Sequence, residues 1–194
     1  MIIAFFDFDG TITKKDSFLD FVKFTHGKRK LQLGLLLYSI HILFYKLNWF
    51  PGQRMKELFL KHYYKGLSKN KFKQLGVDYC NRQLPNIIHA KALKRIQWHK
   101  EQKHKVVVIT ASLSQWIQPW CDDLDIDLIS TEAEIIDGKV TGKLNGKNCN
   151  GPEKVSRIKE TFDFKSITYS YAYGNSSGDK ELLAIANEKF YQYF

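Results

Sequence analysis

Two aspartates directly follow an apolar run at the start of the chain. Residues 2–6 are Ile-Ile-Ala-Phe-Phe, and residues 7–11 are Asp-Phe-Asp-Gly-Thr. Asp7 and Asp9 are two positions apart, so on a continuing strand they would share a face, and Gly10 allows a sharp turn after them. Because converging carboxylates repel each other, the segment indicates a bound cation or a shared proton. An ordinary Asp-Gly turn would explain Asp9 and Gly10 but leave Asp7 without a role.

A hydroxyl group follows a second apolar run. Residues 105–110 are Lys-Val-Val-Val-Ile-Thr, a β-branched sequence typical of a buried parallel strand. Thr110 ends this run, and Ala111 and Ser112 lead from it to a predicted helix. A hydroxyl group and free backbone N–H groups at the start of a helix suit a phosphate group. The alternative is that these residues only cap the helix, as Ser and Thr commonly do.

A lysine opens a later helix. Lys154 follows Pro152, which suits the first position of a helix predicted to run to about residue 161. From there the ammonium group could reach inward as a point charge for a phosphoryl group. The alternative is an ordinary surface lysine, since lysine side chains are mostly exposed.

A turn rich in glycine and polar residues follows another predicted strand. Residues 174–179 are Gly-Asn-Ser-Ser-Gly-Asp. Asn175 offers an amide oxygen and Asp179 a carboxylate, and both are hard ligands suited to Mg²⁺. The alternative is an N-capping Asn or Ser beside a turn aspartate.

Alternating strands and helices must position these groups. The predicted strands are residues 2–6, 105–110, 127–130, 166–173 and 189–194, with a hairpin of 133–136 and 139–143 turning at Asp137-Gly138. The predicted helices of this part are residues 86–103, 114–124, 152–161 and 178–187. This order predicts an α/β fold with a doubly wound parallel sheet, which binds ligands beyond the carboxyl ends of its strands.

The early part of the chain contains helices without an intervening strand. They are expected at residues 17–26, from the basic cluster 28–30 to about 48, at 51–65 and from 68 to before Pro85, with Ser17 as the cap of the first. We expect residues 14–83 to form an α-helical cap inserted after the first strand. Residues 1–13 and 84–194 would form the catalytic core.

Length and cysteine content limit the class of protein. A chain of 194 residues with 44% hydrophobic residues can form one core domain with an insertion. Its three widely spaced cysteines show neither a disulfide framework nor a metal-ligand pattern, which favours a reducing compartment. The N-terminal apolar run is interrupted by Asp7 too early for a signal peptide, so we expect a cytoplasmic protein.

Charge is distributed unevenly along the chain. Residues 14–104 contain 20 Lys/Arg against 5 Asp/Glu, a net charge of +15, whereas the remainder carries −5. This asymmetry indicates an anionic partner for the basic half, or else a solvated basic surface that maintains solubility. The chain contains no recognisable RNA- or DNA-binding motif.

Residues 31–45 form a fifteen-residue segment without a formal charge. It is shorter than the ~20 apolar residues that a transmembrane helix requires. One interpretation is a central helix of the cap, covered on all sides by its neighbours. The other is peripheral contact with an anionic membrane, to which the basic flanks of the segment would be attracted.

The four polar motifs together resemble those of the haloacid dehalogenase superfamily. Residues 7–11, Thr110, Lys154 and residues 174–179 occur in the order and at the spacing of that superfamily, and they span nearly the whole chain. The helical insertion between the first two motifs is similar to that of subfamily IB, the phosphoserine-phosphatase-like hydrolases.

This resemblance implies a role for each matching residue. Asp7 would be the nucleophile that forms an aspartyl-phosphate, and Asp9 would protonate the leaving alcohol and then accept a proton from water. The implied phosphate-binding residues are Gly10, Thr110, Ala111 and Lys154. The implied activity is Mg²⁺-dependent hydrolysis of phosphomonoesters.

The resemblance also implies a metal site, with one departure from the family pattern. Mg²⁺ would bind the Asp7 carboxylate and the Asp9 backbone carbonyl, supported by Asn175 and Asp179 in the last motif. The family usually has an aspartate where this chain has Asn175, so we expect weaker metal binding. A catalytically weak or inactive module that binds a lipid or nucleic-acid surface is the alternative.

Substrate choice would depend on the cap. Relatives in this subfamily act on phosphoserine, on other small phosphomonoesters and on phosphatidylglycerophosphate. The uncharged segment 31–45 and the basic half favour a lipid or amphiphilic phosphate. The alternative is a small monoester such as phosphoserine, since a fold does not determine a substrate.

Overall fold

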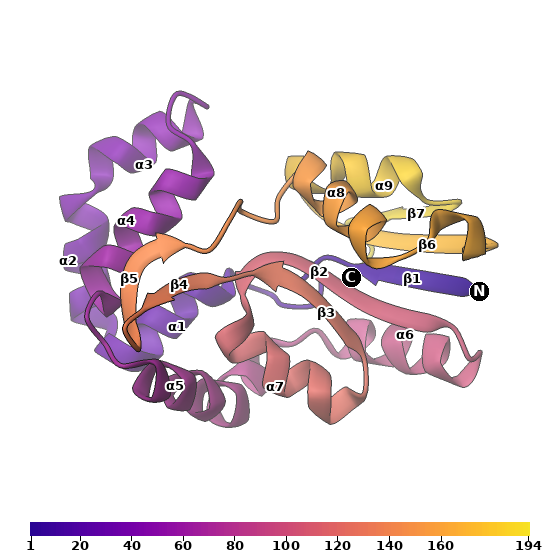
Figure 1. Ribbon diagram of the computed structural model, residues 1–194, viewed down its shortest axis with the longest axis horizontal. Helices are drawn as coiled ribbons and strands as arrows, with labels where there is room; N and C mark the ends of the chain where they lie inside the picture. The colour runs from indigo at the N-terminus through magenta and orange to yellow at the C-terminus, as the bar shows by residue number, and fades with distance from the viewer.

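β1 (Ile2–Phe6) lies at the centre of a five-stranded sheet in the computed structural model, which describes all 194 residues (Figure 1). The strand order is β3-β2-β1-β6-β7, and every pairing is parallel. The other strands are β2 (Lys105–Leu113), β3 (Asp127–Thr131), β6 (Tyr169–Gly174) and β7 (Glu188–Tyr191). The chain changes sides of β1 after β3, so β1 and β6 flank the switch point at which such sheets bind ligands.

Helices cover both faces of this sheet. α6 (Ala90–Glu101) and α7 (Ser114–Leu124) lie on one face, and α8 (Pro152–Thr161) and α9 (Lys180–Ile185) lie on the other (Figure 1). The predicted doubly wound α/β fold is therefore confirmed.

Successive residues of the central strands serve opposite faces of the sheet, as the pleat requires. One buried cluster includes Ile3, Phe5, Val107 and Ile109 with Ile158 of α8 and Leu182 of α9. The other includes Ala4, Phe6, Val106 and Val108 with Ile96 of α6 and Trp116 of α7. This alternation of two buried faces explains why the strands read as nearly continuous apolar runs.

Five helices connect β1 to the sheet-covering α6. They are α1 (Ser17–His26), α2 (Lys28–Leu37), α3 (Ser39–Lys46), α4 (Gly52–Tyr64) and α5 (Lys69–Arg82), and they gather at one end of the molecule (Figure 1). A hairpin of β4 (Ala133–Ile136) and β5 (Lys139–Leu144) packs on α4. Contact is close at Gly142, where an added Cβ would lie 2.6 Å from the Cα of Lys61.

The five helices share a hydrophobic cluster with the sheet and with α7. Phe21 of α1 stacks on Trp116 of α7 with ring centroids 4.4 Å apart. α5 lies against the same helix at Gly76, where an added Cβ would lie 2.0 Å from the carbonyl oxygen of Gln115. The division of the chain into a cap of residues 14–83 and a core stays a prediction, but its two parts have one continuous apolar interior.

One predicted helix is divided in two. The helix predicted to follow the basic cluster 28–30 and to run to about residue 48 bends at Tyr38, where ψ is 15°, and so forms α2 and α3. The Tyr38 ring packs on Phe59 of α4 at 5.6 Å, which holds the bend over α4. No helix of the structure has both the length and the apolar content that crossing a membrane demands.

Another predicted helix begins later than expected. Residues 84–87 form a short 3₁₀ turn, and α6 starts only at Ala90. The reason is tertiary: Ile87 accepts a hydrogen bond from the N–H of Lys14, and His89 donates one to the carbonyl of Ile12. The segment after β1 therefore holds Ile88 and His89 in extended backbone, and the α-helix can begin only after them.

Other element boundaries also differ from those expected. β2 continues past Thr110 to Leu113, which pairs with Thr131 of β3, so Ala111 and Ser112 lie on the strand. The strand predicted at residues 166–173 begins at Tyr169, after a 3₁₀ turn (Phe164–Ser166). The helix predicted at 178–187 is shortened to α9, after a 3₁₀ turn (Ser177–Asp179).

Candidate active site

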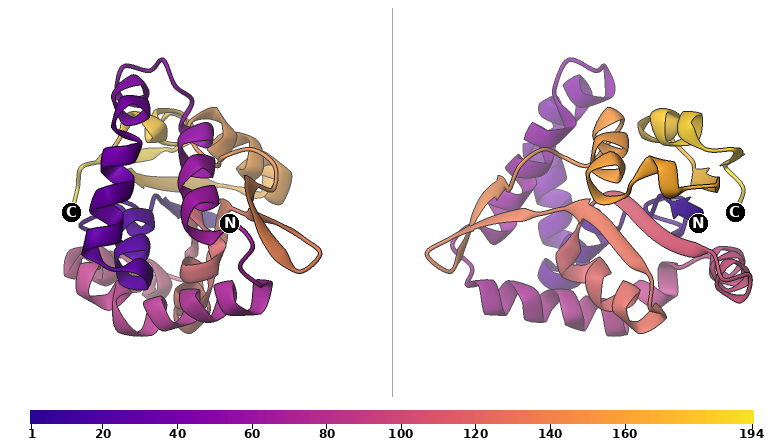
Figure 2. Two further views of the ribbon diagram at one scale, coloured as in Figure 1. Left: turned by 90° about the vertical axis from the view of Figure 1, so that its left-hand side faces the viewer. Right: turned by 45° about the vertical axis from the view of Figure 1, so that its right-hand side comes forward.

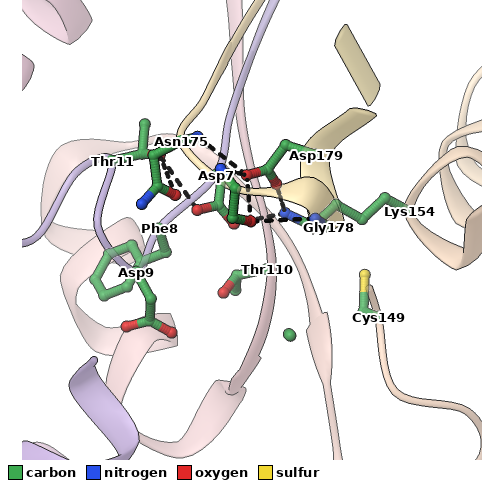
Figure 3. Close-up of polar contacts among 12 residues, drawn as sticks. Asp7, Phe8, Asp9, Thr11, Thr110, Cys149, Lys154, Asn175, Gly178 and Asp179 are labelled. Atoms are coloured by element: carbon green, nitrogen blue, oxygen red, sulfur yellow. Dashed lines mark hydrogen bonds and ion pairs between the residues drawn. The ribbon is translucent and has the colours of Figure 1, made fainter. Parts of the chain in front are cut away.

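A buried lysine joins two carboxylates at the carboxyl end of the central strands (Figure 3). Lys154 Nζ, from the first turn of α8, lies 2.5 Å from Asp7 Oδ1 and 2.7 Å from Asp179 Oδ1. None of the three residues is more than 6% exposed. Asp7 is held in line with the sheet because its N–H donates to the carbonyl of Tyr173 at 2.9 Å. The sheet and α8 thus bring together three residues that lie far apart in the sequence.

The ion pairs determine the charge of this group. Burial raises the pKa of Asp7 to about 6, although the charge of Lys154 acts in the opposite direction. Burial alone would lower the pKa of Lys154, but the two carboxylates raise it above its ordinary value. Burial would likewise raise the pKa of Asp179, yet Lys154 and backbone N–H groups hold it below the usual range. At neutral pH the group therefore holds one cation between two carboxylates.

Asp9 points away from this ion-paired group (Figure 3). Its Oδ1 accepts the backbone N–H of Ser17 at 2.7 Å, and its Oδ2 accepts the hydroxyl of Ser112. Burial raises the pKa of Asp9 to about 6, with a further increase from the charge of Asp16. Asp9 is therefore fixed between the start of α1 and β2, with a proton affinity well above that of an exposed aspartate.

Two serines hold Asp9, and the sequence did not indicate this role for either. The Ser17 and Ser112 hydroxyls are 3.0 Å apart, and the indole N–H of Trp116 donates to Ser17. The sequence predicted Ser17 as the helix cap, but Asp16 is the N-cap and accepts the N–H of Leu19 at 2.9 Å. Ser17 is instead the first residue of α1, which frees its N–H for Asp9.

Gly10 and Asn175 meet beside the Asp7 carboxylate. Gly10 has φ +80°, and an added Cβ would lie 2.2 Å from Asn175 Nδ2. The hydroxyl of Thr11 lies 3.3 Å from Asp7 Oδ2 and 3.2 Å from Asn175 Oδ1. Since a hydroxyl carries one proton, it can donate to only one of these two oxygens at a time.

The oxygen atoms around Thr11 suit a hard divalent cation. A carboxylate oxygen of Asp7 and the amide oxygen of Asn175 converge there, and oxygen ligands are those that Mg²⁺ prefers. The structure has no group of three or more His, Cys, Asp or Glu side chains placed to hold a metal. The donor set therefore fits Mg²⁺ with fewer charged ligands than a site with three carboxylates.

Asp179 serves the turn and the lysine. Its Oδ2 accepts the backbone N–H groups of Asn175 and Ser176 at 3.1 and 3.0 Å, and the Ser176 hydroxyl at 2.9 Å. Its Oδ1 accepts Lys154. Asp179 was predicted as a metal ligand, and that role stays a prediction; in the structure its two oxygens hold Lys154 and the loop after β6.

Thr110 and Ala111 lie near the carboxyl end of β2. Thr110 is buried, and its hydroxyl oxygen accepts the N–H of Ser112 at 3.0 Å. The carbonyl of Ala111 accepts a hydrogen bond from Lys56 Nζ. The strand, rather than a helix N-terminus, therefore presents these two predicted phosphate-binding residues.

Lys56 is a second cation at the site, supplied by α4. Its Nζ also donates to Asn148 Oδ1 at 2.9 Å. Burial lowers the pKa of Lys56 to about 8, although the charges of Asp9 and Asp16 oppose this shift. Nothing in the local sequence distinguishes Lys56 from the other lysines, because only the packing of α4 over the strand ends brings it here.

A cavity of about 380 Å³ opens between the strand ends and the helices. Its polar wall is formed by Asp7, Asp9, Asp16, Lys56, Thr110 and Ser112. Its apolar wall is formed by Phe18, Leu35, Ile42, Met55 and Phe59. The two walls together suit a ligand with an anionic group at one end and an apolar group at the other.

Comparison with known proteins gives consistent results. A family model described as haloacid dehalogenase-like hydrolase matches residues 4–184. Over 195 residues the chain is 32% identical to Protein CicA of Caulobacter vibrioides, an alignment that covers 100% of this chain and 86% of that protein.

Two solved structures share the fold. A Bordetella pertussis Tohama I protein superposes with a TM-score of 0.81 at 20% identity, covering 94% of this chain and 86% of that one. A phospho-aspartyl intermediate analogue of phosphoserine phosphatase superposes with a TM-score of 0.68 at 15% identity, covering 96% of this chain and 84% of that one.

Proposed function

Because this chain belongs to the haloacid dehalogenase-like hydrolase family, we propose that it hydrolyses phosphomonoesters, with Asp7 as the nucleophile. The observation that carries this proposal is the buried lysine between Asp7 and Asp179. Lys154 keeps Asp7 ionised despite its burial and leaves a positive charge beside the position that a phosphoryl group would occupy. The shared fold with phosphoserine phosphatases supports the same reaction class.

In the first step, an Asp7 carboxylate oxygen attacks phosphorus as the bond between phosphorus and the ester oxygen breaks. Asp9, whose pKa is raised to about 6 by burial, gives its proton to the departing alkoxide. The products are a free alcohol and an acyl phosphate on Asp7. Lys154 offsets the negative charge that develops on the phosphoryl oxygens.

In the second step, water attacks the phosphorus of the acyl phosphate. Asp9, now ionised, accepts the proton of this water, and the Asp7 carboxylate leaves with the bonding electrons. Inorganic phosphate is released, and both aspartates return to their starting states. The hydrogen bonds from Ser17 and Ser112 hold Asp9 in one position for both proton transfers.

A Mg²⁺ ion would be held by the Asp7 carboxylate, the backbone carbonyl of Asp9 and the side-chain oxygen of Asn175. When bound, it supplies positive charge that reduces repulsion between the phosphoryl oxygens and Asp7. Asn175 contributes no charge of its own, so this site should need more Mg²⁺ than one with a carboxylate there.

The apolar wall of the cavity favours a lipid or amphiphilic phosphate as substrate. The phosphate would lie at Asp7, and its apolar portion would contact side chains such as Phe18 and Phe59. A small monoester such as phosphoserine would leave this wall without a partner.

Phosphate release from an aryl phosphate tests the reaction class. The purified protein should release inorganic phosphate in a Mg²⁺-dependent manner, and Asp7→Asn should reduce the rate on the order of 10³-fold or more. Acid quenching during turnover should leave phosphate covalently on the wild type, removable by hydroxylamine, and none on Asp7→Asn. Asp137→Asn, in the exposed hairpin turn, is the matched control and should keep full activity. Metal-independent turnover that survives Asp7→Asn would contradict the proposal.

Asn175 favours one second candidate, an anion-binding module without turnover. An uncharged ligand in place of an aspartate is expected in a protein that has lost its metal and keeps only its basic surface. The variant Asn175→Asp separates the two candidates: an enzyme should gain both Mg²⁺ affinity and turnover. Undetectable hydrolysis in the wild type and the variant, with salt-dependent binding of anions, would instead favour the module.

A further inference from the structure

An exposed apolar stripe runs along α2 and α3. Its members are spaced three and four residues apart, which places them on one side of these helices. Its members are Leu33, Leu36, Leu37, Ile40, Leu43, Phe44 and Leu47, each 39–72% exposed. Trp49, in the turn after α3, is 76% exposed and extends the stripe. Contiguous exposed apolar surface of this kind marks an interaction site in soluble proteins.

The other side of the same helices already has a partner. Leu31, Leu35, Tyr38 and Ile42 pack against the main hydrophobic cluster, and Gly34 allows α2 to approach Tyr63 of α4 closely. Packing within the molecule therefore leaves the leucines on the outer side of these helices uncovered. A helix that only covered a core would carry polar residues on its outer side.

The part of the sequence that carries the stripe is basic and contains no acidic residue. Residues 21–56 contain seven Lys or Arg and no Asp or Glu. Lys28, Arg29 and Lys30 are exposed at the start of α2, and Lys46 is exposed at the end of α3. None of these four side chains forms an ion pair, since every ion pair of the molecule involves other residues. An apolar stripe with basic ends is complementary to a lipid layer, which has an apolar interior and an anionic surface.

We propose that the stripe and its basic ends form a docking surface for an anionic lipid bilayer. The helices would lie in the interface with their leucines and Trp49 among the acyl chains and their lysines at the headgroups. They stand beside α4, and the turn that joins α3 to α4 is the end of this group farthest from α5 (Figure 2). This placement leaves the sheet and its other helices outside the bilayer.

Docking would also bring the cavity to the membrane. Leu35, Ile42, Tyr45 and Lys46 line the cavity, and they belong to the same two helices as the stripe. A lipid phosphate could then enter with its headgroup directed to Asp7 and its chain along the apolar wall. This last step rests on the proposed phosphatase activity, whereas docking itself does not.

Vesicle flotation tests the docking surface with the full chain. Vesicles of phosphatidylglycerol and phosphatidylcholine should bind the protein at low salt, and vesicles of phosphatidylcholine alone should bind it far more weakly. The triple variant Leu36→Ser/Ile40→Ser/Trp49→Ser should weaken binding at least about 100-fold. The variant Lys28→Gln/Arg29→Gln/Lys30→Gln should weaken it about fivefold for each charge removed, which corresponds to ~1 kcal/mol per residue.

A control variant removes exposed apolar side chains from elsewhere. Ile136→Ser/Tyr191→Ser changes side chains that are 55% and 56% exposed on β4 and β7, and it should bind vesicles as the wild type does. Equal binding by the control and the triple variant, or no binding to anionic vesicles, would overturn the proposal. Concentration-dependent dimerisation in sedimentation velocity that the triple variant abolishes, without vesicle binding, would overturn it in favour of a second copy of this chain.

The test distinguishes docking from catalysis. Asp7→Asn should bind vesicles like the wild type, and the triple variant should hydrolyse a soluble aryl phosphate like the wild type. Vesicle binding without hydrolysis would leave the docking surface standing and contradict the proposed function. Hydrolysis without vesicle binding would support the proposed function and contradict the docking surface.

Discussion

The candidate active site at the strand ends and the apolar stripe on α2 and α3 differ in where charged and apolar side chains lie. At the strand ends, Lys154 is 1% exposed and paired on both sides with carboxylates. Along α2 and α3, leucines are exposed, and Lys28, Arg29, Lys30 and Lys46 form no ion pair with a carboxylate. The charged groups of the first region are paired within the molecule, whereas the exposed groups of the second are not. The proposed active site is thus marked by internal ion pairs, and the proposed docking surface by exposed groups without a partner.

Removing the central cation should have the largest effect on this contrast. Lys154→Ala leaves Asp7 and Asp179 buried without a counter-charge, and we expect a loss of about 3–5 kcal/mol in the free energy of unfolding. Lys159→Ala, on the exposed side of the same helix, should change it by less than about 0.5 kcal/mol. Urea denaturation of both variants measures the difference. Similar urea midpoints for the two variants would mean that the ion pairs of Lys154 do not stabilise the fold.

Acid should weaken the sheet end of the molecule through His99. Burial, with a smaller effect of Arg95, lowers the pKa of His99 to about 3, and its ring nitrogens contact Tyr173 and His104 at 2.9 Å. The folded-state pKa lies below that of the unfolded chain, so unfolding takes up a proton between these values. The stabilising contribution is complete above about pH 6.5 and is lost as the pH falls toward 3.

The measurement for His99 is the free energy of unfolding against pH. Between pH 6.5 and 4.5 the wild type should lose about 2–3 kcal/mol more than His99→Gln, which cannot take up the proton. Parallel profiles for the two proteins would show that His99 titrates equally in both states.

Closing the space beside Asn175 should have an intermediate effect. Gly10→Ala introduces strain at φ +80° and a contact of 2.2 Å with Asn175, so we expect a loss of about 1–3 kcal/mol and weaker Mg²⁺ binding. Gly146→Ala has a similar φ of +84° but meets nothing within 4 Å, so it reports the strain alone. Thermal denaturation and Mg²⁺ titration of both variants isolate the contribution of the contact. If the two variants lose the same stability and bind Mg²⁺ equally well, the close contact with Asn175 is not the reason for a glycine at position 10.

Substitution within the stripe should have the smallest effect on folding. Leu36 is 72% exposed, so Leu36→Ser should change the free energy of unfolding by less than about 0.5 kcal/mol. A loss above about 2 kcal/mol in urea denaturation would mean that the stripe is part of the core and would remove the contrast between the two regions.

The sequence predicted the parts of this protein that depend on local pattern. The apolar runs of β1 and β2 indicated buried parallel strands, and the motif order indicated the family to which the chain belongs. The strands are confirmed because a strand buried on both faces must be apolar on both. The family is confirmed by the family model that matches residues 4–184. The structure shows that Asp7, Lys154 and Asp179 lie in contact. Their predicted chemical roles stay predictions.

Features that depend on tertiary packing could not be predicted from the pattern. Lys56 reaches the site only because α4 crosses the strand ends, and Ser112 contacts Asp9 only because β2 continues past Thr110. The bend at Tyr38 follows from its contact with α4, which helix periodicity does not encode. Asp16, and not the predicted Ser17, is the helix cap. Both residue types are good caps, so the sequence alone does not distinguish them.

The shared aromatic cluster of Phe21 and Trp116 has a consequence for motion. Rotating all five helices away from the sheet as one body would expose this cluster to water, at a cost of several kcal/mol. α2 and α3 contribute no fully buried apolar side chain, so they can move at far lower cost. Ligand entry and exit should therefore follow local opening of these two helices, and their amide hydrogens should exchange with solvent long before those of α1 and α5.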